Sequence, residues 1–153
     1  MKVNFGTESK EENEAKLPPP WIGVDLDKTL AHYDKFVSWD HIGDPIPDMV
    51  AKVKEWLEKG IVVKILTARL SFVSRSLSGV SYEDMAAVIK KWCKKHIGTE
   101  LEVTSEKDCF MLGFCDDSAV QIDPNTGKPL AKNGYEFLDK RIKELEEKEE
   151  VYK

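Results

Sequence analysis

Four polar clusters in the chain each lie beside a short apolar segment. They are Asp25 and Asp27 after residues 21–24, Thr67 and Arg69 after 61–66, Lys107 in the loop between 101–103 and 109–115, and Asp116 and Asp117 after 109–115. The carboxyl ends of parallel strands meet at one edge of a sheet, and open α/β sheets bind ligands at that edge. If the apolar segments are parallel strands, the four clusters converge on one site.

The residue types in these clusters suit phosphoryl transfer assisted by a cation. Several carboxylates in one crevice repel each other unless a cation holds them. Oxygen ligands with no His or Cys nearby favour a hard ion such as Mg²⁺. A carboxylate can attack phosphorus to give an aspartyl-phosphate, and a second carboxylate two residues on can act as general acid and base. A Thr hydroxyl and a Lys ammonium can hold the phosphoryl oxygens.

The elements that must position these clusters alternate between strands and helices. The pattern predicts strands at 21–24, 61–66, 101–103, 109–115 and 119–122, helices at 47–59, 82–96 and 135–149, and loops at 31–46 and 70–81. Such alternation is typical of an α/β fold with a mostly parallel sheet. We therefore expect a three-layer Rossmann-like fold with a five-stranded sheet.

The sequence predicts that the chain consists of three parts: a tail, a domain and a terminal helix. Residues 1–19 are predicted to be a flexible polar tail, 20–134 a catalytic domain, and 135–153 a C-terminal helix that packs on this domain or extends from it. The intervals 30–60 and 70–100 are too short to hold a separate cap domain as well as the predicted helices. The site should therefore lie open at the edge of the sheet.

Composition and charge narrow the function classes. The chain has 153 residues, of which 41% are hydrophobic and 33% charged, the balance of one globular domain. Its net charge of −5 gives no general attraction to nucleic acid or to an anionic membrane. No apolar run reaches the ~20 residues of a membrane span, and the N-terminal stretch does not resemble a signal peptide, so a cytoplasmic protein is expected. Cys93, Cys109 and Cys115 are predicted to be buried thiols.

The clusters also resemble the motifs of a known family. Asp25-Leu26-Asp27-Lys28-Thr29 matches the DxDxT first motif of the haloacid dehalogenase superfamily in its phosphatase form. Thr67 matches the second motif, Lys107 the third and Asp116-Asp117 the fourth, in the family's order. Small capless phage and bacterial members look similar over longer stretches. Many relatives carry Gly where this chain has Lys28.

The resemblance implies an enzyme, a Mg²⁺-dependent phosphatase with a role for each cluster. It implies Asp25 as nucleophile and metal ligand, Asp27 as general acid and base with its carbonyl on the metal, Thr67 and Lys107 as phosphoryl-binding residues, and Asp116 and Asp117 as metal ligands. For Arg69, contact with substrate and a surface ion pair are equally expected.

The substrate is left open by the sequence. We expect a phosphomonoester, either a phosphorylated small molecule or a nucleotide, with a nucleic-acid end and an oligomeric enzyme as further options. The alternative is a catalytically weak module that binds phosphorylated ligands without turnover. Receiver-type signalling domains use similar residues in another order; here Thr67 precedes Lys107 and both precede Asp116, which favours the enzyme.

Overall fold

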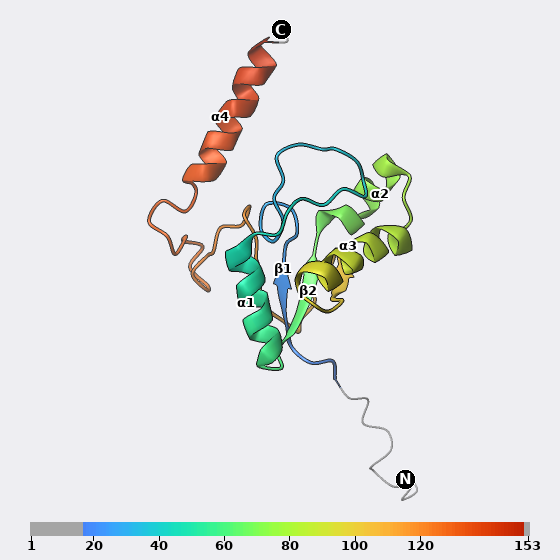
Figure 1. The fold of residues 1–153 in the computed structure, drawn as a ribbon. Helices are drawn as coiled ribbons and strands as arrows, with labels where there is room; N and C mark the ends of the chain where they lie inside the picture. Colours follow the sequence, from blue (N-terminus) through green and yellow to red (C-terminus); the bar gives the residue numbers. More distant parts are fainter. Residues whose placement is uncertain (1–16, 152–153) are drawn as a thin grey trace, which may run out of the picture. The chain divides into compact units, whose positions relative to one another are not determined.

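The computed structural model describes residues 17–151 (Figure 1). Most of the predicted N-terminal tail, residues 1–16, lies outside the described residues. The chain divides into two compact units, Met1–Cys115 and Asp116–Lys153, each of which is described by itself.

A four-stranded parallel sheet forms the centre of the first unit. The strands are β1 (Trp21–Val24), β2 (Val62–Leu66), β3 (Glu102–Thr104) and β4 (Met111–Cys115), in the order β3-β2-β1-β4. The mixed α/β fold and these four strands were therefore predicted correctly. Each apolar run ends abruptly in polar residues, which fixes where its strand ends.

The predicted fifth strand at 119–122 is wrong. In the second unit Ile122 forms only an isolated antiparallel bridge with Pro129. The Asp123 amide donates to the Lys128 carbonyl at 2.8 Å, so the chain turns back on itself at this point. Local turn hydrogen bonds have replaced pairing with the sheet.

The three long helices were predicted at nearly their observed bounds. They are α1 (Pro47–Glu58), α3 (Tyr82–His96) and α4 (Glu136–Val151). Pro47 lies in the first turn of α1, where its missing N–H costs nothing. The Ser81 hydroxyl accepts a hydrogen bond from the Asp84 amide and caps α3.

The loop predicted at 70–81 is wrong, because this segment is largely helical. A 3₁₀ turn, η1 (Ala68–Leu70), leads into α2 (Phe72–Ser78). The Ser71 hydroxyl accepts from the Ser74 amide at the start of α2, and Gly79 ends it with φ 69°. The serines that suggested a loop include the residue that caps a helix.

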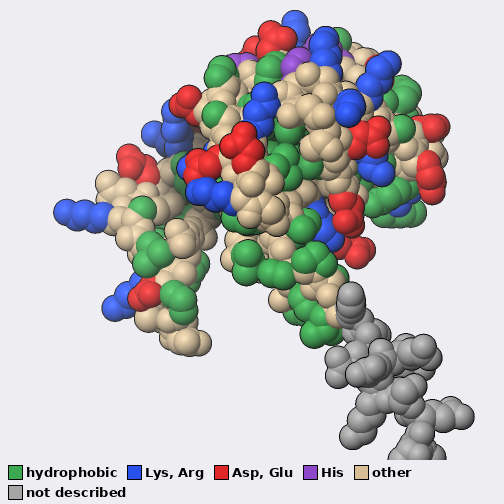
Figure 2. All heavy atoms as spheres, turned by 60° about the horizontal axis from the view of Figure 1, so that its bottom comes forward, with side chains coloured by type: hydrophobic (Ala, Val, Ile, Leu, Met, Phe, Trp, Pro, Cys, Tyr) green, Lys and Arg blue, Asp and Glu red, His purple; other side chains and the backbone are tan. Residues whose placement is uncertain are grey.

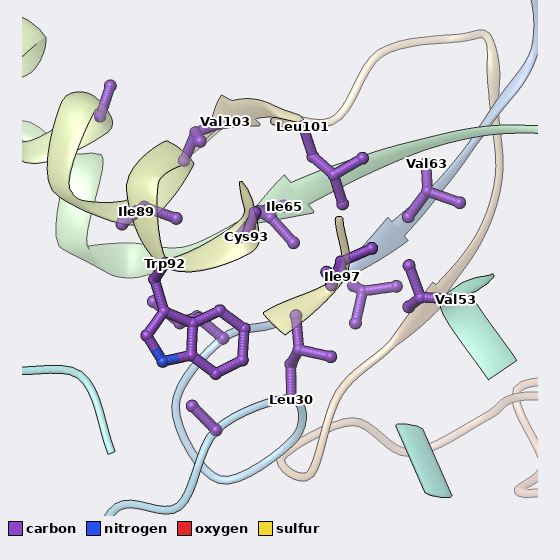
Figure 3. Close-up of a cluster of buried hydrophobic side chains, with 14 of the residues drawn as sticks. Leu30, Val53, Val63, Ile65, Ile89, Trp92, Cys93, Ile97, Leu101 and Val103 are labelled. Atoms are coloured by element: carbon purple, nitrogen blue, oxygen red, sulfur yellow. The ribbon is translucent and has the colours of Figure 1, made fainter. Parts of the chain in front are cut away.

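The hydrophobic core lies between one face of the sheet and two helices. Val53 of α1 and Ile89 and Cys93 of α3 point toward Val63 and Ile65 of β2 (Figure 3). All five side chains are at most 3% exposed. Burial raises the pKa of the Cys93 thiol to about 12. Helices α1 and α3 therefore form one layer over the sheet.

The opposite face of the sheet is covered differently. Trp21 lies on this face and is 1% exposed. Its indole N–H donates to Asp108 at 2.9 Å, and its amide donates to the Phe110 carbonyl at 3.0 Å. Residues 105–110 therefore run back along this face from β3 to β4 without a helix. In the first unit a layer of helices therefore covers one face of the sheet, and a segment without a helix crosses the other face.

The exposure of the three cysteines confirms only part of what the composition predicted. Cys109 is exposed and Cys115 half-buried, so the prediction of three buried thiols holds for Cys93 alone. Acidic and basic side chains are interspersed over the face shown in Figure 2. No helix among residues 17–151 has both the length and the apolar character needed to cross a membrane.

We predict that Gly23→Ala destabilises the protein while Gly113→Ala does not. A Cβ on Gly23 would lie 3.1 Å from Trp21, 3.2 Å from Phe114 and 3.4 Å from Met111. We expect a cost of about 1–3 kcal/mol from this overpacking. A Cβ on Gly113, in β4, meets no atom within 4 Å. Urea unfolding of the two variants is the test, and equal losses would contradict the packing described here.

Candidate active site

Strand pairing places the first two clusters at the same edge of the sheet. Asp25 directly follows β1, and its amide donates to the Cys115 carbonyl of β4 at 2.9 Å. Thr67 directly follows β2, and its amide donates to the Thr104 carbonyl of β3 at 2.9 Å. The ladders thus continue one residue past β1 and β2. Because β1 and β2 are parallel neighbours, Asp25 and Thr67 leave the sheet at its carboxyl edge.

A tight turn after β1 presents the acidic pair. The Leu26 carbonyl accepts hydrogen bonds from the Leu30 and Ala31 amides at 2.9 Å each. Leu26 and Leu30 are fully buried, whereas Asp25 and Asp27 are half-buried. Apolar side chains therefore anchor the turn from below and leave both carboxylates facing partly outward.

Thr29 and Lys28 in this turn have structural features that the sequence analysis did not predict. The Thr29 hydroxyl donates to an Asp25 carboxylate oxygen at 3.4 Å. Lys28 has φ 71°, a left-handed conformation in which a side chain is strained. Glycine, which has no Cβ, would adopt this conformation without that strain.

Arg69 binds Asp27 through a two-pronged ion pair. Its Nε and Nη2 atoms donate to the two Asp27 carboxylate oxygens at 2.7 and 2.8 Å. The Arg69 side chain is 15% exposed and that of Asp27 is 24% exposed. The structure thus shows an ion pair for Arg69, and its partner is a candidate catalytic residue.

Thr67 is buried at the end of β2, with 3% of its surface exposed. Its hydroxyl oxygen accepts from the Arg69 amide at 3.2 Å and so caps η1. A hydroxyl that accepts a hydrogen bond still has its own O–H to donate. The position of Thr67 is compatible with the predicted contact to a phosphoryl oxygen.

Lys107 is exposed and lies in the segment that crosses the outer face of the sheet. It makes no side-chain hydrogen bond or ion pair with any residue in the described part of the chain. Its neighbour Asp108 contacts Trp21, the first residue of β1, and the indole N–H lowers the pKa of Asp108. Asp25 lies beyond the other end of that strand. The structure therefore does not bring Lys107 into contact with Asp25.

Asp116 and Asp117 open the second unit, directly after Cys115. Asp117 accepts from the Ser118 hydroxyl at 3.2 Å and forms an ion pair with Arg141 at 3.6 Å. Arg141 also donates to Ser118 at 3.0 Å. Nothing in the sequence pattern indicated Arg141, because it lies on a helix far along the chain from Asp117.

The loop at 31–46 was predicted correctly and is fixed at its base. The Ile46 amide donates to the Leu30 carbonyl at 2.9 Å, and the His32 amide to the Asp44 carbonyl at 2.8 Å. The Trp92 indole of α3 donates to the Gly43 carbonyl at 3.0 Å. These contacts define where the loop leaves and rejoins the domain.

Comparison with known proteins does not identify a family. No protein-family model and no curated protein matches the chain. A solved structure of a conserved protein from Bacteroides thetaiotaomicron is similar to it, with a TM-score of 0.44 and 19% sequence identity. That likeness covers 83% of this chain and 92% of the other, and no function follows from it.

We predict that Lys28→Gly stabilises the protein and Lys28→Ala does not. Glycine removes the left-handed strain at the cost of a more flexible unfolded chain, for a net gain of about 0.5–1 kcal/mol. Alanine keeps the Cβ and therefore the strain. Both variants lose the contact of the Lys28 ammonium with the Tyr33 ring at 5.9 Å, so their difference reports on the backbone alone. Chemical unfolding measures it, and a gain for alanine equal to that for glycine would rule out the strain.

Proposed function

We propose that the protein is a Mg²⁺-dependent phosphohydrolase of the haloacid dehalogenase type that forms an aspartyl-phosphate on Asp25. One observation carries this proposal. Asp25 and Asp27 follow β1, Thr67 and Arg69 follow β2, and Arg69 directly contacts Asp27 across the carboxyl edge of the two strands. Nucleophile, acid/base and phosphoryl-binding groups therefore share one small region.

In the proposed reaction, an Asp25 oxygen attacks phosphorus and the bond to the leaving oxygen breaks. Asp27 gives its proton to that leaving oxygen. Asp27 then takes a proton from a water molecule, which attacks the aspartyl-phosphate and releases inorganic phosphate. Thr67, Arg69 and Lys107 are the proposed substrate-binding residues. For Lys107 this role requires a contact that segment 105–110 does not make in the structure.

The proposed magnesium ligands are the carboxylates of Asp25, Asp116 and Asp117 with the backbone carbonyl of Asp27. Two observations support them: all the donors are oxygen atoms, as Mg²⁺ prefers, and Asp116 follows the residue whose carbonyl binds the Asp25 amide. A bound cation would offset repulsion among the carboxylates and neutralise phosphoryl charge.

The lengths of the connections between the strands indicate what size of substrate the site can accept. The chain between β1 and β2 holds one loop and α1, and the chain between β2 and β3 holds η1, α2 and α3. Neither connection contains a separate cap, so we infer a site that is open at the sheet edge. Such a site suits a bulky phosphomonoester that helps to exclude water, such as a nucleotide or a nucleic-acid end. A three-layer Rossmann-like arrangement belongs to the same proposal.

A second candidate function is a module that binds phosphorylated ligands with little turnover. The observation that favours it is the Asp27–Arg69 pair, in which both carboxylate oxygens of the proposed acid accept hydrogen bonds. Phosphate release from a panel of sugar phosphates, nucleotides and phosphorylated oligonucleotides, with Mg²⁺ present, separates the two functions.

We predict that Asp25→Asn reduces phosphate release by about a thousandfold or more, because the amide cannot act as the nucleophile. The matched control is Asp34→Asn, which makes the same change at an exposed position in the loop and should keep full activity. Steady-state assays and a thermal melt of each variant are the measurements. Full turnover by folded Asp25→Asn would refute the proposed mechanism.

We predict that Mg²⁺ raises the thermal midpoint. A ligand at a hundred times its dissociation constant stabilises the folded state by about 2.7 kcal/mol. Asp116→Ala should reduce this stabilisation, whereas Asp139→Ala, which removes an exposed carboxylate from α4, should not. EDTA should abolish turnover. If Mg²⁺ changes neither melting nor turnover, the proposed ligand set is wrong.

A further inference from the structure

The guanidinium of Arg69 connects three segments that are distant in sequence. Besides its two bonds to Asp27, it donates from Nη1 to the Trp39 carbonyl at 3.2 Å and from Nη2 to the His41 carbonyl at 3.0 Å. One side chain therefore joins the turn after β1, the end of β2 and the middle of loop 31–46. Figure 1 shows this loop as a long excursion between β1 and α1.

The base and the middle of loop 31–46 are held by different contacts. The base is fixed by backbone pairing of Leu30 with Ile46 and by Trp92 of α3. At the middle, the two Arg69 bonds reach carbonyls at Trp39 and His41, while Phe36 and Val37 are 71% and 59% exposed. Trp39 and Ile42 also pack against the core, so loss of the Arg69 bonds would weaken the contacts that hold the middle of the loop and leave its base in place.

A phosphoryl group and the Asp27 carboxylate compete for the same donor. The planar fork of an Arg side chain binds carboxylate and phosphate in the same two-pronged geometry. A phosphoryl dianion carries more charge than one carboxylate, and the proposed site places it beside Thr67, whose hydroxyl already bonds the Arg69 amide. The guanidinium cannot serve both anions with the same two N–H groups.

We propose that Arg69 is a latch released by substrate. Paired with Asp27, it holds the middle of loop 31–46; drawn onto a phosphoryl group, it releases both the loop carbonyls and the Asp27 oxygens. The loop then becomes free to rearrange around the substrate, and Asp27 becomes free to contact the leaving group. This inference rests on the proposed phosphohydrolase function and adds a mechanism that regulates the same site.

Hydrogen–deuterium exchange of the full chain, with Mg²⁺ and with or without inorganic phosphate, tests the latch. We expect the amide of His41, which donates to the Ser38 carbonyl at 3.2 Å in the middle of the loop, to exchange about tenfold faster with phosphate, which corresponds to roughly 1.4 kcal/mol. Amides at the base of the loop should not change. Unchanged or slower exchange of the His41 amide at saturating phosphate would overturn the proposal.

Variants separate the latch from general loss of charge. Arg69→Ala should exchange fast without phosphate and show no further response to it, and Arg69→Lys should behave similarly because Lys lacks the fork. The matched control is Arg75→Ala. It removes a positive side chain whose Nε donates to the Leu70 carbonyl at 3.0 Å, and its loop should exchange as in the unmodified protein. If Arg69→Ala does not fold, Asp27→Asn keeps Arg69, weakens the pair and should also speed exchange. Slow exchange in folded Arg69→Ala or in Asp27→Asn would refute the latch.

The outcomes distinguish the latch from the proposed function. Turnover that is lost in Asp25→Asn, together with loop exchange that ignores phosphate, would remove the latch and keep the phosphohydrolase. A loop that responds to phosphate in a protein without turnover would keep the latch and favour the binding module.

Discussion

β1 is hydrogen-bonded on both sides, to β2 and to β4, and the candidate site depends on this central position. The turn with Asp25 and Asp27 follows the four residues of β1, so it lies between the carboxyl ends of β2 and β4. The pairing is parallel on both sides, so all three strands deliver their following residues to one edge. The side chains of Val24, Leu26 and Leu30 are fully buried and anchor the turn that carries the carboxylates.

The two faces of this sheet are stabilised in different ways. On one face α1 and α3 supply the aliphatic core, which orients β2 and the residues after it. On the other face Trp21 packs against Gly23 and its indole N–H donates to Asp108, so a loop takes the place of a crossover helix. The connection between β3 and β4 is therefore short, and it places Lys107 on this face of the sheet.

Much of the fold was predictable because short apolar runs bounded by polar residues mark buried strands. The missed helix α2 has no buried residue, and Phe72, Val73 and Leu77 are all exposed, so its pattern lacks the contrast that identifies an amphipathic helix. For the site, the sequence predicted which strands its residues follow but not which side chains contact each other. The pairing of Arg69 with Asp27 links residues 42 positions apart and depends on side-chain geometry, which residue spacing does not encode. The path of residues 105–110 depends on Trp21 packing in the same way.

The short β3 has a consequence for the behaviour of the chain in concentrated solution. It is an edge strand of three residues, and its exposed Glu102 pairs with Lys64 of β2 at 3.2 Å. The other edge, β4, shifts register against β1 between Trp21 and Ile22. Short, charged or irregular edges offer few unpaired backbone groups in line for a strand of another molecule. The β3 edge of the sheet is thus protected from pairing side by side with a strand of another molecule.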